Sequence, residues 1–252
     1  MKYFPKLHLK FPFNLTKIET FFYFCILVKF SYDMIEIKRI SFNAFQENTI
    51  LLWDENKTCI IIDPGYYSEE EKLYFHKLIQ SLSLVPTAIL LTHAHFDHIH
   101  GLGDCVNTYK IPVYMHPNEK LTIQNNVKLC TNMGITLPNT DIKTIDITDE
   151  EVLKFGTMTF EVIFTPGHSP GGVAYLVRNE KLIISGDSLF AGSIGRTDLA
   201  GGDYDVLMSS IFNKLLPLDG DIVVIPGHGP ETSIAVERAT NPFLMPFNEP
   251  FE

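Results

Sequence analysis

The chain has 252 residues, of which 45% are hydrophobic and 20% are charged, as in an ordinary globular protein. Thirty acidic and 20 basic residues give a formal net charge of −10. This balance disfavours nonspecific binding to nucleic acid, since that binding neutralises phosphates with Lys and Arg. The length suits one large α/β domain or two small ones.

Residues 1–33 differ in composition from the rest of the chain. They are rich in Phe, Lys and Tyr, and their apolar run at 21–28 is shorter than the roughly 20 residues that span a bilayer. No small-residue cleavage site follows, and Met34 opens a regular strand pattern. We interpret 1–33 as a leader that is either a mis-assigned start or disordered, with an atypical export leader as the alternative. Residues 34–252 then form the functional domain.

Apolar runs separated by turn residues predict the elements from Met34 onward. In the first half we expect strands at 35–40, 48–53, 58–62, 88–92 and 111–114, and helices at 68–81, 101–109 and 118–129. In the second half we expect strands at 158–164, 173–178, 181–185 and 222–225, a helix at 204–216 and a short one after Glu231. The two halves are alike and no linker separates them. They predict one domain, a sandwich of two mixed sheets with helices outside.

The segment 92–101 is unusually dense in metal-binding side chains, with four histidines and one aspartate. It directly follows a predicted buried strand, and α/β enzymes commonly keep their sites at strand carboxyl ends. In extended chain, alternate side chains point the same way, so His93 and His95 can bind one metal ion. Asp97 and His98 can supply a second position. A solvated loop that binds metal adventitiously is the alternative.

Three further segments make that alternative weak. Each is an apolar run that ends on a candidate ligand in a turn: His168, Asp187 and His228. Imidazoles combined with carboxylates suit Zn²⁺, and also Fe²⁺ or Mn²⁺. The residues therefore predict a site for two metal ions, which we expect to be zinc, with iron or manganese possible.

The order of these ligands, together with the turns Asp63-Pro-Gly65 and Pro226-Gly-His-Gly229, resembles the metallo-β-lactamase superfamily. The resemblance covers nearly all of the chain after Met34. Within the superfamily the chain is most similar to short, single-domain glyoxalase II-like enzymes (hydroxyacylglutathione hydrolases), through the loop 192–199 and the ending 241–244. The resemblance implies an α/β (α+β) fold of the αββα type.

The resemblance also implies a role for each ligand. Metal 1 would be held by His93, His95 and His168, and metal 2 by Asp97, His98 and His228. Asp187 would bridge the two metals, and Asp63 would orient a ligand imidazole from outside. His100 is expected to be a loop or helix-face residue rather than a ligand.

Two departures from related enzymes limit what is carried over. Full-length glyoxalase II has a helical C-terminal domain that grips glutathione, whereas this chain ends about two dozen residues after His228. β-Lactamases of the superfamily lack the equivalent of His98 and carry a cysteine in place of Asp187. On that ground we do not expect β-lactam hydrolysis.

The chemistry of two metal ions that share a water favours acyl hydrolysis. Two metals that share a water lower its pKa to roughly 7, so hydroxide exists at neutral pH. Asp97 and Asp187 are then the catalytic carboxylates: Asp187 holds the pair and Asp97 accepts a hydrogen bond from the hydroxide. A thiol with a pKa of about 8.5 leaves as the thiolate without a strong acid, so the chemistry favours thioester hydrolysis. The resemblance implies a small-molecule thioester of the hydroxyacylglutathione type as the substrate. Arg196 either meets a substrate carboxylate or ties its loop to Asp198.

Other functions remain open from the sequence. One is a persulfide dioxygenase of the same superfamily, with a single iron on His93, His168 and Asp187. A lactone or ester hydrolase would use the same ligands. A nuclease and a noncatalytic binding module are disfavoured, the first by the acidic balance and the second because no ligand is missing. Neither nucleic acid nor a membrane is an expected partner.

The four cysteines favour a reducing compartment. Cys25, Cys59, Cys105 and Cys130 form no Cys-x-x-Cys pair and are too sparse for a disulfide framework. We therefore expect a cytoplasmic protein, in which Cys59, within an apolar run, is a buried free thiol.

Overall fold

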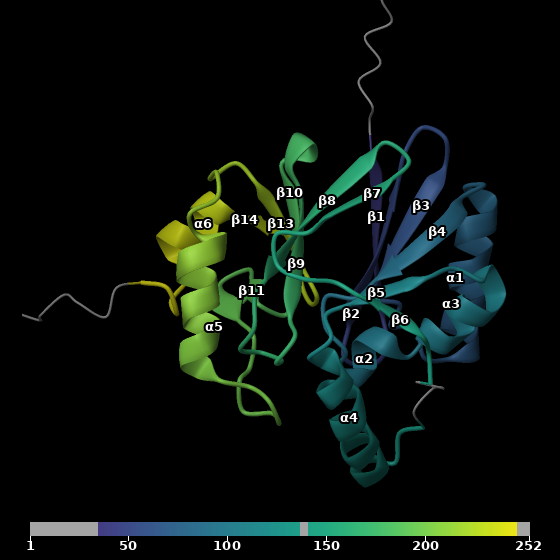
Figure 1. Ribbon diagram of the computed structural model, residues 1–252, viewed down its shortest axis with the longest axis horizontal. Coiled ribbons are helices and arrows are strands. Elements are labelled where there is room, and N and C mark those ends of the chain that lie inside the picture. The colour runs from purple at the N-terminus through teal and green to yellow at the C-terminus, as the bar shows by residue number, and fades with distance from the viewer. Residues whose placement is uncertain (1–34, 137–140, 246–252) are drawn as a thin grey trace, which may run out of the picture. The chain divides into compact units, whose positions relative to one another are not determined.

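Two six-stranded sheets face each other at the centre of the fold (Figure 1). The computed structural model describes residues 35–136 and 141–245, which belong to one structural unit, Asp33–Glu252. The predicted leader at 1–33 lies outside the described residues.

The first sheet is built by the first half of the chain. Its strands, in spatial order, are β1 (Glu36–Phe42), β2 (Glu47–Trp53), β3 (Thr58–Ile62), β4 (Val85–Leu90), β5 (Val113–Met115) and β6 (Thr144–Asp146). The pairs β1–β2 and β2–β3 are antiparallel, whereas β3 to β6 run parallel. All seven residues of β2 are buried, as expected for a strand with covered faces.

The second sheet comes from the second half and is also mixed. Its strands, in spatial order, are β14 (Thr232–Ser233), β13 (Val223–Pro226), β10 (Leu182–Gly186), β9 (Val173–Val177), β8 (Met158–Phe164) and β7 (Val152–Phe155). Only β10 and β13 pair in parallel. A small hairpin, β11 (Leu189–Phe190) with β12 (Ser193–Ile194), follows β10.

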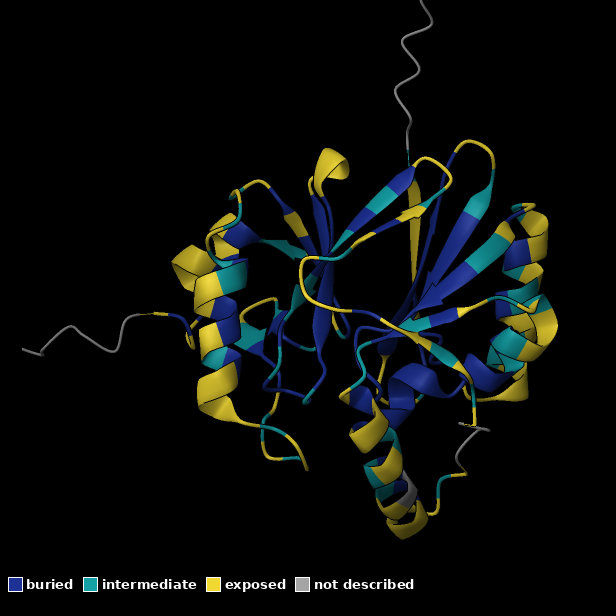
Figure 2. Cartoon of the chain, viewed as in Figure 1, coloured by how far each residue is buried: buried dark blue, intermediate teal, exposed yellow. Residues whose placement is uncertain are grey.

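Helices cover the outer faces of both sheets, which makes the four-layer αββα arrangement predicted from the sequence. Figure 1 shows α1 (Glu69–Ser81) and α3 (Leu102–Tyr109) on one side, and α5 (Tyr204–Ser210) and α6 (Ile234–Thr240) on the other. Three apolar cores fill the layers, one between the sheets and one under each helix layer. Figure 2 shows mostly buried strands and helices with one exposed face. None of the described helices has the length and apolar character needed to cross a bilayer.

The helices α2 (Phe96–Ile99) and α4 (Glu119–Met133) lie at one end of the strands, at the bottom of Figure 1. The loops that carry the predicted ligands reach this same end. The two halves therefore bring their polar side chains together at this end of the strands.

Most predicted elements are confirmed within a few residues. Ser68 caps α1 through a reciprocal hydrogen-bond pair with Glu71, so the helix begins where the sequence predicted. The predicted helix at 204–216 is found as α5 followed by a π-helical turn at Ile211–Leu215. The one-turn helix α2 and the short strands β6, β7, β11, β12 and β14 were missed, because such short segments carry little periodic signal.

Candidate metal centre

The loop after β4 presents four of the predicted ligands. His93 and His95 stand in extended chain, and α2 then turns Asp97 and His98 toward the same side. All four side chains are buried. One short stretch of backbone therefore serves two groups of ligands, because it changes from extended to helical in its middle.

The first group consists of His93, His95 and His168, whose ligand atoms lie within 4.8 Å of one another. His95 Nδ1 is 2.9 Å from His168 Nε2. The Nδ1–H of His168 donates to the carbonyl of Arg196 at 2.7 Å, so its Nε2 carries the lone pair that faces the group.

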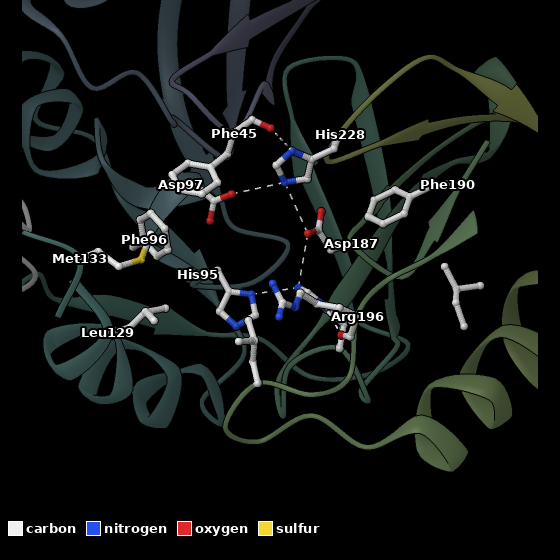
Figure 3. A pocket seen from close by; sticks show the side chains of 13 residues that line it. Phe45, His95, Phe96, Asp97, Leu129, Met133, Asp187, Phe190, Arg196 and His228 are labelled. Atoms are coloured by element: carbon white, nitrogen blue, oxygen red, sulfur yellow. Dashed lines mark hydrogen bonds and ion pairs between the residues drawn. The ribbon is translucent and has the colours of Figure 1, made fainter. Parts of the chain in front are cut away.

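The second group consists of Asp97, His98 and His228, again within 4.8 Å of one another. His228 Nδ1–H donates to the carbonyl of Phe45 at 2.9 Å, and its Nε2 points toward Asp97 at 3.4 Å (Figure 3). In His168 and His228 a backbone carbonyl thus accepts from Nδ1–H and orients the ring, so that Nε2 faces the ligand group, as in protein metal sites.

Asp187 lies between the two groups. Its Oδ2 is 3.4 Å from His168 Nε2 and 3.5 Å from His228 Nε2, and its Oδ1 is 3.5 Å from His98 Nε2. A Cβ at Gly227 would stand 2.1 Å from Asp187 Oδ1, so only glycine leaves room for this carboxylate. Asp187 therefore has the position expected of a ligand that both groups share.

The residues present fit metal ions, because two buried polar atoms of the centre lack a partner. His93 Nε2 and Asp187 Oδ1 are buried and have no hydrogen-bond partner among the described residues. Buried polar atoms without a partner are rare in proteins, and an ion between the groups would satisfy both atoms.

The protonation states of two imidazoles and one carboxylate agree with that fit. Burial lowers the pKa of His93 well below its ordinary value, and burial together with the imidazole of His168 lowers the pKa of His95 to about 3. Both rings are therefore neutral at pH 7, the form that binds metal. Burial alone would raise the pKa of Asp97, but His98, His228 and His95 together outweigh it and hold the pKa of the carboxyl below its usual range, hence ionised.

Asp63 makes the contact expected of a residue that orients a ligand. Its Oδ1 accepts from Thr92 N–H at 2.7 Å, and its Oδ2 accepts from Thr92 Oγ1–H at 2.5 Å and from His98 Nδ1–H at 3.1 Å. Asp63, His93 and His98 also lie within 4.8 Å of one another. Because both carboxylate oxygens already accept hydrogen bonds, we assign Asp63 the positioning role rather than that of a ligand.

His100 and Arg196 are placed beside the ligands but outside both groups. His100 packs its ring 4.6 Å from that of Tyr67, in agreement with the predicted helix-face role. Arg196 lines the pocket described below, and its guanidinium donates two hydrogen bonds to Asp198 at 2.8 and 2.7 Å. The loop-tying alternative for Arg196 is therefore present in the structure.

Two buried glutamates were missed in the sequence. Glu47 begins β2, where its Oε2 accepts from Thr49 and its Oε1 lies 3.9 Å from His98 Nδ1. Glu119 begins α4 and accepts from the backbone N–H of Ala94 at 2.7 Å and of Gly171 at 2.6 Å. In the sequence each glutamate is only a carboxylate at the start of an ordinary strand or helix. Its role becomes visible only through its tertiary contacts.

A pocket of about 510 Å³ opens onto the metal centre. In Figure 3 the polar side chains of the centre lie in the middle of the view, with aromatic and aliphatic side chains on both sides of them. The apolar walls of the pocket are Phe45, Phe96, Leu129, Met133, Phe190, Ile194 and Leu199. Such a mostly apolar pocket with a few convergent polar groups is typical of small-molecule sites.

The class of protein follows from this fold and this centre. The family model described as the metallo-beta-lactamase superfamily matches residues 42–228. The chain therefore belongs to the metallo-β-lactamase superfamily, and with its two ligand groups it is a metal-dependent hydrolase of that family.

Two relatives are similar along nearly their whole length. The probable metallo-hydrolase YqgX of Bacillus subtilis (strain 168) is 41% identical over 215 residues, which cover 84% of this chain and 98% of the relative. The hydroxyacylglutathione hydrolase GloC of Haemophilus influenzae is 38% identical over 214 residues, covering 83% and 98%.

Two solved structures share the fold at similar identity. A crystal structure of BLEG-1 B3 metallo-beta-lactamase has a TM-score of 0.77 and 41% identity, covering 83% of this chain and 100% of that one. A di-iron-bound form of TTHA1623 has a TM-score of 0.74 and 38% identity, covering 82% and 100%. The described sheets and helices thus match known members of the superfamily.

Proposed function

We propose that this chain hydrolyses thioesters of the hydroxyacylglutathione type at a centre of two metal ions. The observation that carries the proposal is that two complete ligand groups converge on one carboxylate, Asp187, beneath a pocket. The likeness to GloC, a hydroxyacylglutathione hydrolase, supports the choice of substrate. We expect a small molecule as partner, neither nucleic acid nor a membrane.

The seven ligands of the proposed centre are those predicted from the sequence: His93, His95, Asp97, His98, His168, Asp187 and His228. We propose zinc as the metal. Iron is the main alternative, because the similar TTHA1623 binds two iron ions in its crystal structure, and manganese suits the same donors.

Bound divalent metal ions supply hydroxide at neutral pH and stabilise negative charge on an acyl oxygen. The chain's own residues supply orientation. Asp97, which is ionised and lines the pocket, can accept a hydrogen bond from the attacking hydroxide and aim it at the acyl carbon. The apolar walls hold the acyl group and exclude other water from the carbonyl.

The first test is hydrolysis of S-D-lactoylglutathione by the full chain loaded with zinc, followed at the thioester absorbance. We expect rapid turnover that a chelator abolishes and zinc restores. A fully metallated protein without turnover would refute the thioesterase proposal while the superfamily assignment stands.

Three other activities should be measured alongside thioester hydrolysis, each with its own substrate. Persulfide oxidation would show one iron per chain and oxygen uptake with glutathione persulfide, and lactone hydrolysis would appear with simple lactones. β-Lactams are included because BLEG-1, described as a B3 metallo-β-lactamase, is 41% identical to this chain. That likeness weakens the expectation, drawn from the missing cysteine, that β-lactams are not substrates.

A further inference from the structure

Beside the pocket over the metal centre lies a second lobe of about 330 Å³, bounded by α4 and by Leu199–Ala200. The two cavities share His95, Leu129 and Leu199 in their walls, so the lobe continues the pocket along the helix. A substrate whose reacting carbonyl sits at the centre therefore has space for a second half beside α4.

The helix faces this lobe with several polar side chains. Asn125, Lys128 and Asn132 line it at helical spacings of three and four residues, together with Leu129, so they share one face of α4. Among the described residues, no ion pair or hydrogen bond engages the side chains of these two asparagines and the lysine. Their amides and ammonium are free to bind a ligand.

The charge of the lobe is opposite to that of the chain. The chain has a net charge of −10, yet the residues that line the lobe include Lys128 and neither Asp nor Glu. A local cationic lining in an acidic protein attracts anions and discriminates against cations. Asparagine amides, which both donate and accept, match the amide groups of a peptide.

The position of the helix is fixed relative to the metal centre. Glu119, at the first turn of α4, joins the loops that carry His95 and His168 through the N–H groups of Ala94 and Gly171. Asn126 Nδ2–H, about two turns further along, donates to the carbonyl of Ala94 at 2.6 Å. The distance from the lobe to the reacting centre is therefore set by hydrogen bonds, as a specificity site requires.

We propose that this lobe binds the thiol half of the substrate, and that this half is a small anionic thiol with peptide amides. The proposal rests on thioester hydrolysis as the proposed function. Lys128 pairs with a carboxylate of the thiol, Asn125 and Asn132 hydrogen-bond to its amides, and the acyl half occupies the apolar pocket. The lobe is thus the specificity site of this chain.

The test compares two thioethers that cannot be hydrolysed, S-hexylglutathione and its diethyl ester, in binding to the metal-loaded full chain by calorimetry. The diester keeps the peptide amides but lacks both carboxylate charges and carries two added ethyl groups, so the effect of each substitution is measured for each thioether separately. We expect the variant Lys128→Gln to weaken binding of S-hexylglutathione about 2- to 5-fold, the range of an exposed ion pair, and to leave the diester unchanged. The difference should shrink at high salt.

The matched control is Lys120→Gln. Lys120 is a lysine of the same helix that is paired with Asp146 at 2.9 Å and lies outside the lobe. We expect it to change neither affinity. The double variant Asn125→Ala, Asn132→Ala should weaken both thioethers alike, because the amides are common to them. Unchanged melting temperatures would show that all variants fold.

Equal affinity of wild type and Lys128→Gln for S-hexylglutathione would overturn the lobe assignment, whatever the enzyme hydrolyses. Failure of the proposed function looks different: S-hexylglutathione would bind in a Lys128-dependent way, but S-D-lactoylglutathione would not be cleaved. Where cleavage is observed, Lys128→Gln should raise KM for this substrate by the same factor and leave kcat unchanged.

Discussion

Replacing Glu119 by Gln tests whether the metal centre depends on a residue that touches no metal. Glu119 is fully buried, and its two oxygens accept from Ala94 N–H at 2.7 Å and Gly171 N–H at 2.6 Å. Burial raises the pKa of Glu119, yet only the ionised carboxylate can accept at both oxygens. Glutamine has one carbonyl oxygen, so one of the two N–H groups must lose its acceptor.

The magnitude follows from that loss. A hydrogen bond to a charged group contributes about 1.5–3 kcal/mol, and a buried donor left unpaired costs about 1–3 kcal/mol, so we expect Glu119→Gln to lower the free energy of unfolding by about 2–4 kcal/mol. For a chain of this size that corresponds to a fall in melting temperature of about 5–15 °C.

A specific effect on the metal should accompany the loss of stability. The two N–H groups belong to the loops that carry His93, His95 and His168, so either loop can shift its imidazole. Loss of a residue that orients ligands typically costs about 10- to 100-fold in metal affinity. We expect a decrease in that range in the zinc affinity of Glu119→Gln, measured by competition with a chromogenic chelator.

The matched control is Glu237→Gln. Glu237 is equally buried but lies in α6, where it accepts from Gly192 N–H at 2.9 Å, Thr232 Oγ1–H at 2.6 Å and Asn241 Nδ2–H at 2.7 Å. The variant Glu237→Gln should lower the free energy of unfolding by a similar amount and leave the zinc affinity unchanged. If Glu119→Gln also kept full zinc affinity while melting lower, Glu119 would be a structural residue and the reasoning would be refuted.

Asp187→Ala should keep the fold but lower kcat by more than the roughly 100-fold that loss of a merely orienting residue costs, because both ligand groups lose their shared carboxylate; retained activity with full metal content would contradict the centre. Gly227→Ala places a Cβ 2.1 Å from Asp187 Oδ1 and should reduce bound metal, as measured by metal analysis; an unchanged metal content would count against the crowding argument. Chelation should lower the melting temperature and added zinc should restore it, since ligand at 100 times its Kd stabilises by about 2.7 kcal/mol; an identical melting curve would argue against tight binding. Burial raises the pKa of Cys105 to about 12 and raises that of Cys59 further, so neither thiol should be alkylated by iodoacetamide at pH 8 until the chain unfolds; mass spectrometry of modified peptides from the folded protein would reveal any error.

The sequence alone predicted the candidate ligands because their chemistry is local. All seven stand in short segments after apolar runs, and a histidine-rich segment such as 92–101 has few explanations other than a metal. The sandwich was predictable for a related reason: runs such as 48–53 and 58–62 are long enough to show that they are buried, and both halves repeat the same order of elements.

Short elements and single buried carboxylates were not predictable in this way. The helix α2 has four residues, too few for a periodic pattern, yet it decides that Asp97 and His98 join a different group from His93 and His95. Glu47 and Glu119 look like ordinary charged residues in the sequence, because a glutamate at an element's start is usually solvated.

The sequence by itself therefore determined which side chains can bind metal and which class of fold carries them. Only the tertiary structure decided how these side chains divide into two groups, that Asp187 lies between them, and that Glu119 joins two of the ligand loops. The physical reason is the separation along the chain of the residues that encode each feature. Ligand identity and strand pattern are encoded over a few neighbouring residues, whereas Ala94, Glu119 and Gly171 meet only after both sheets have packed against each other.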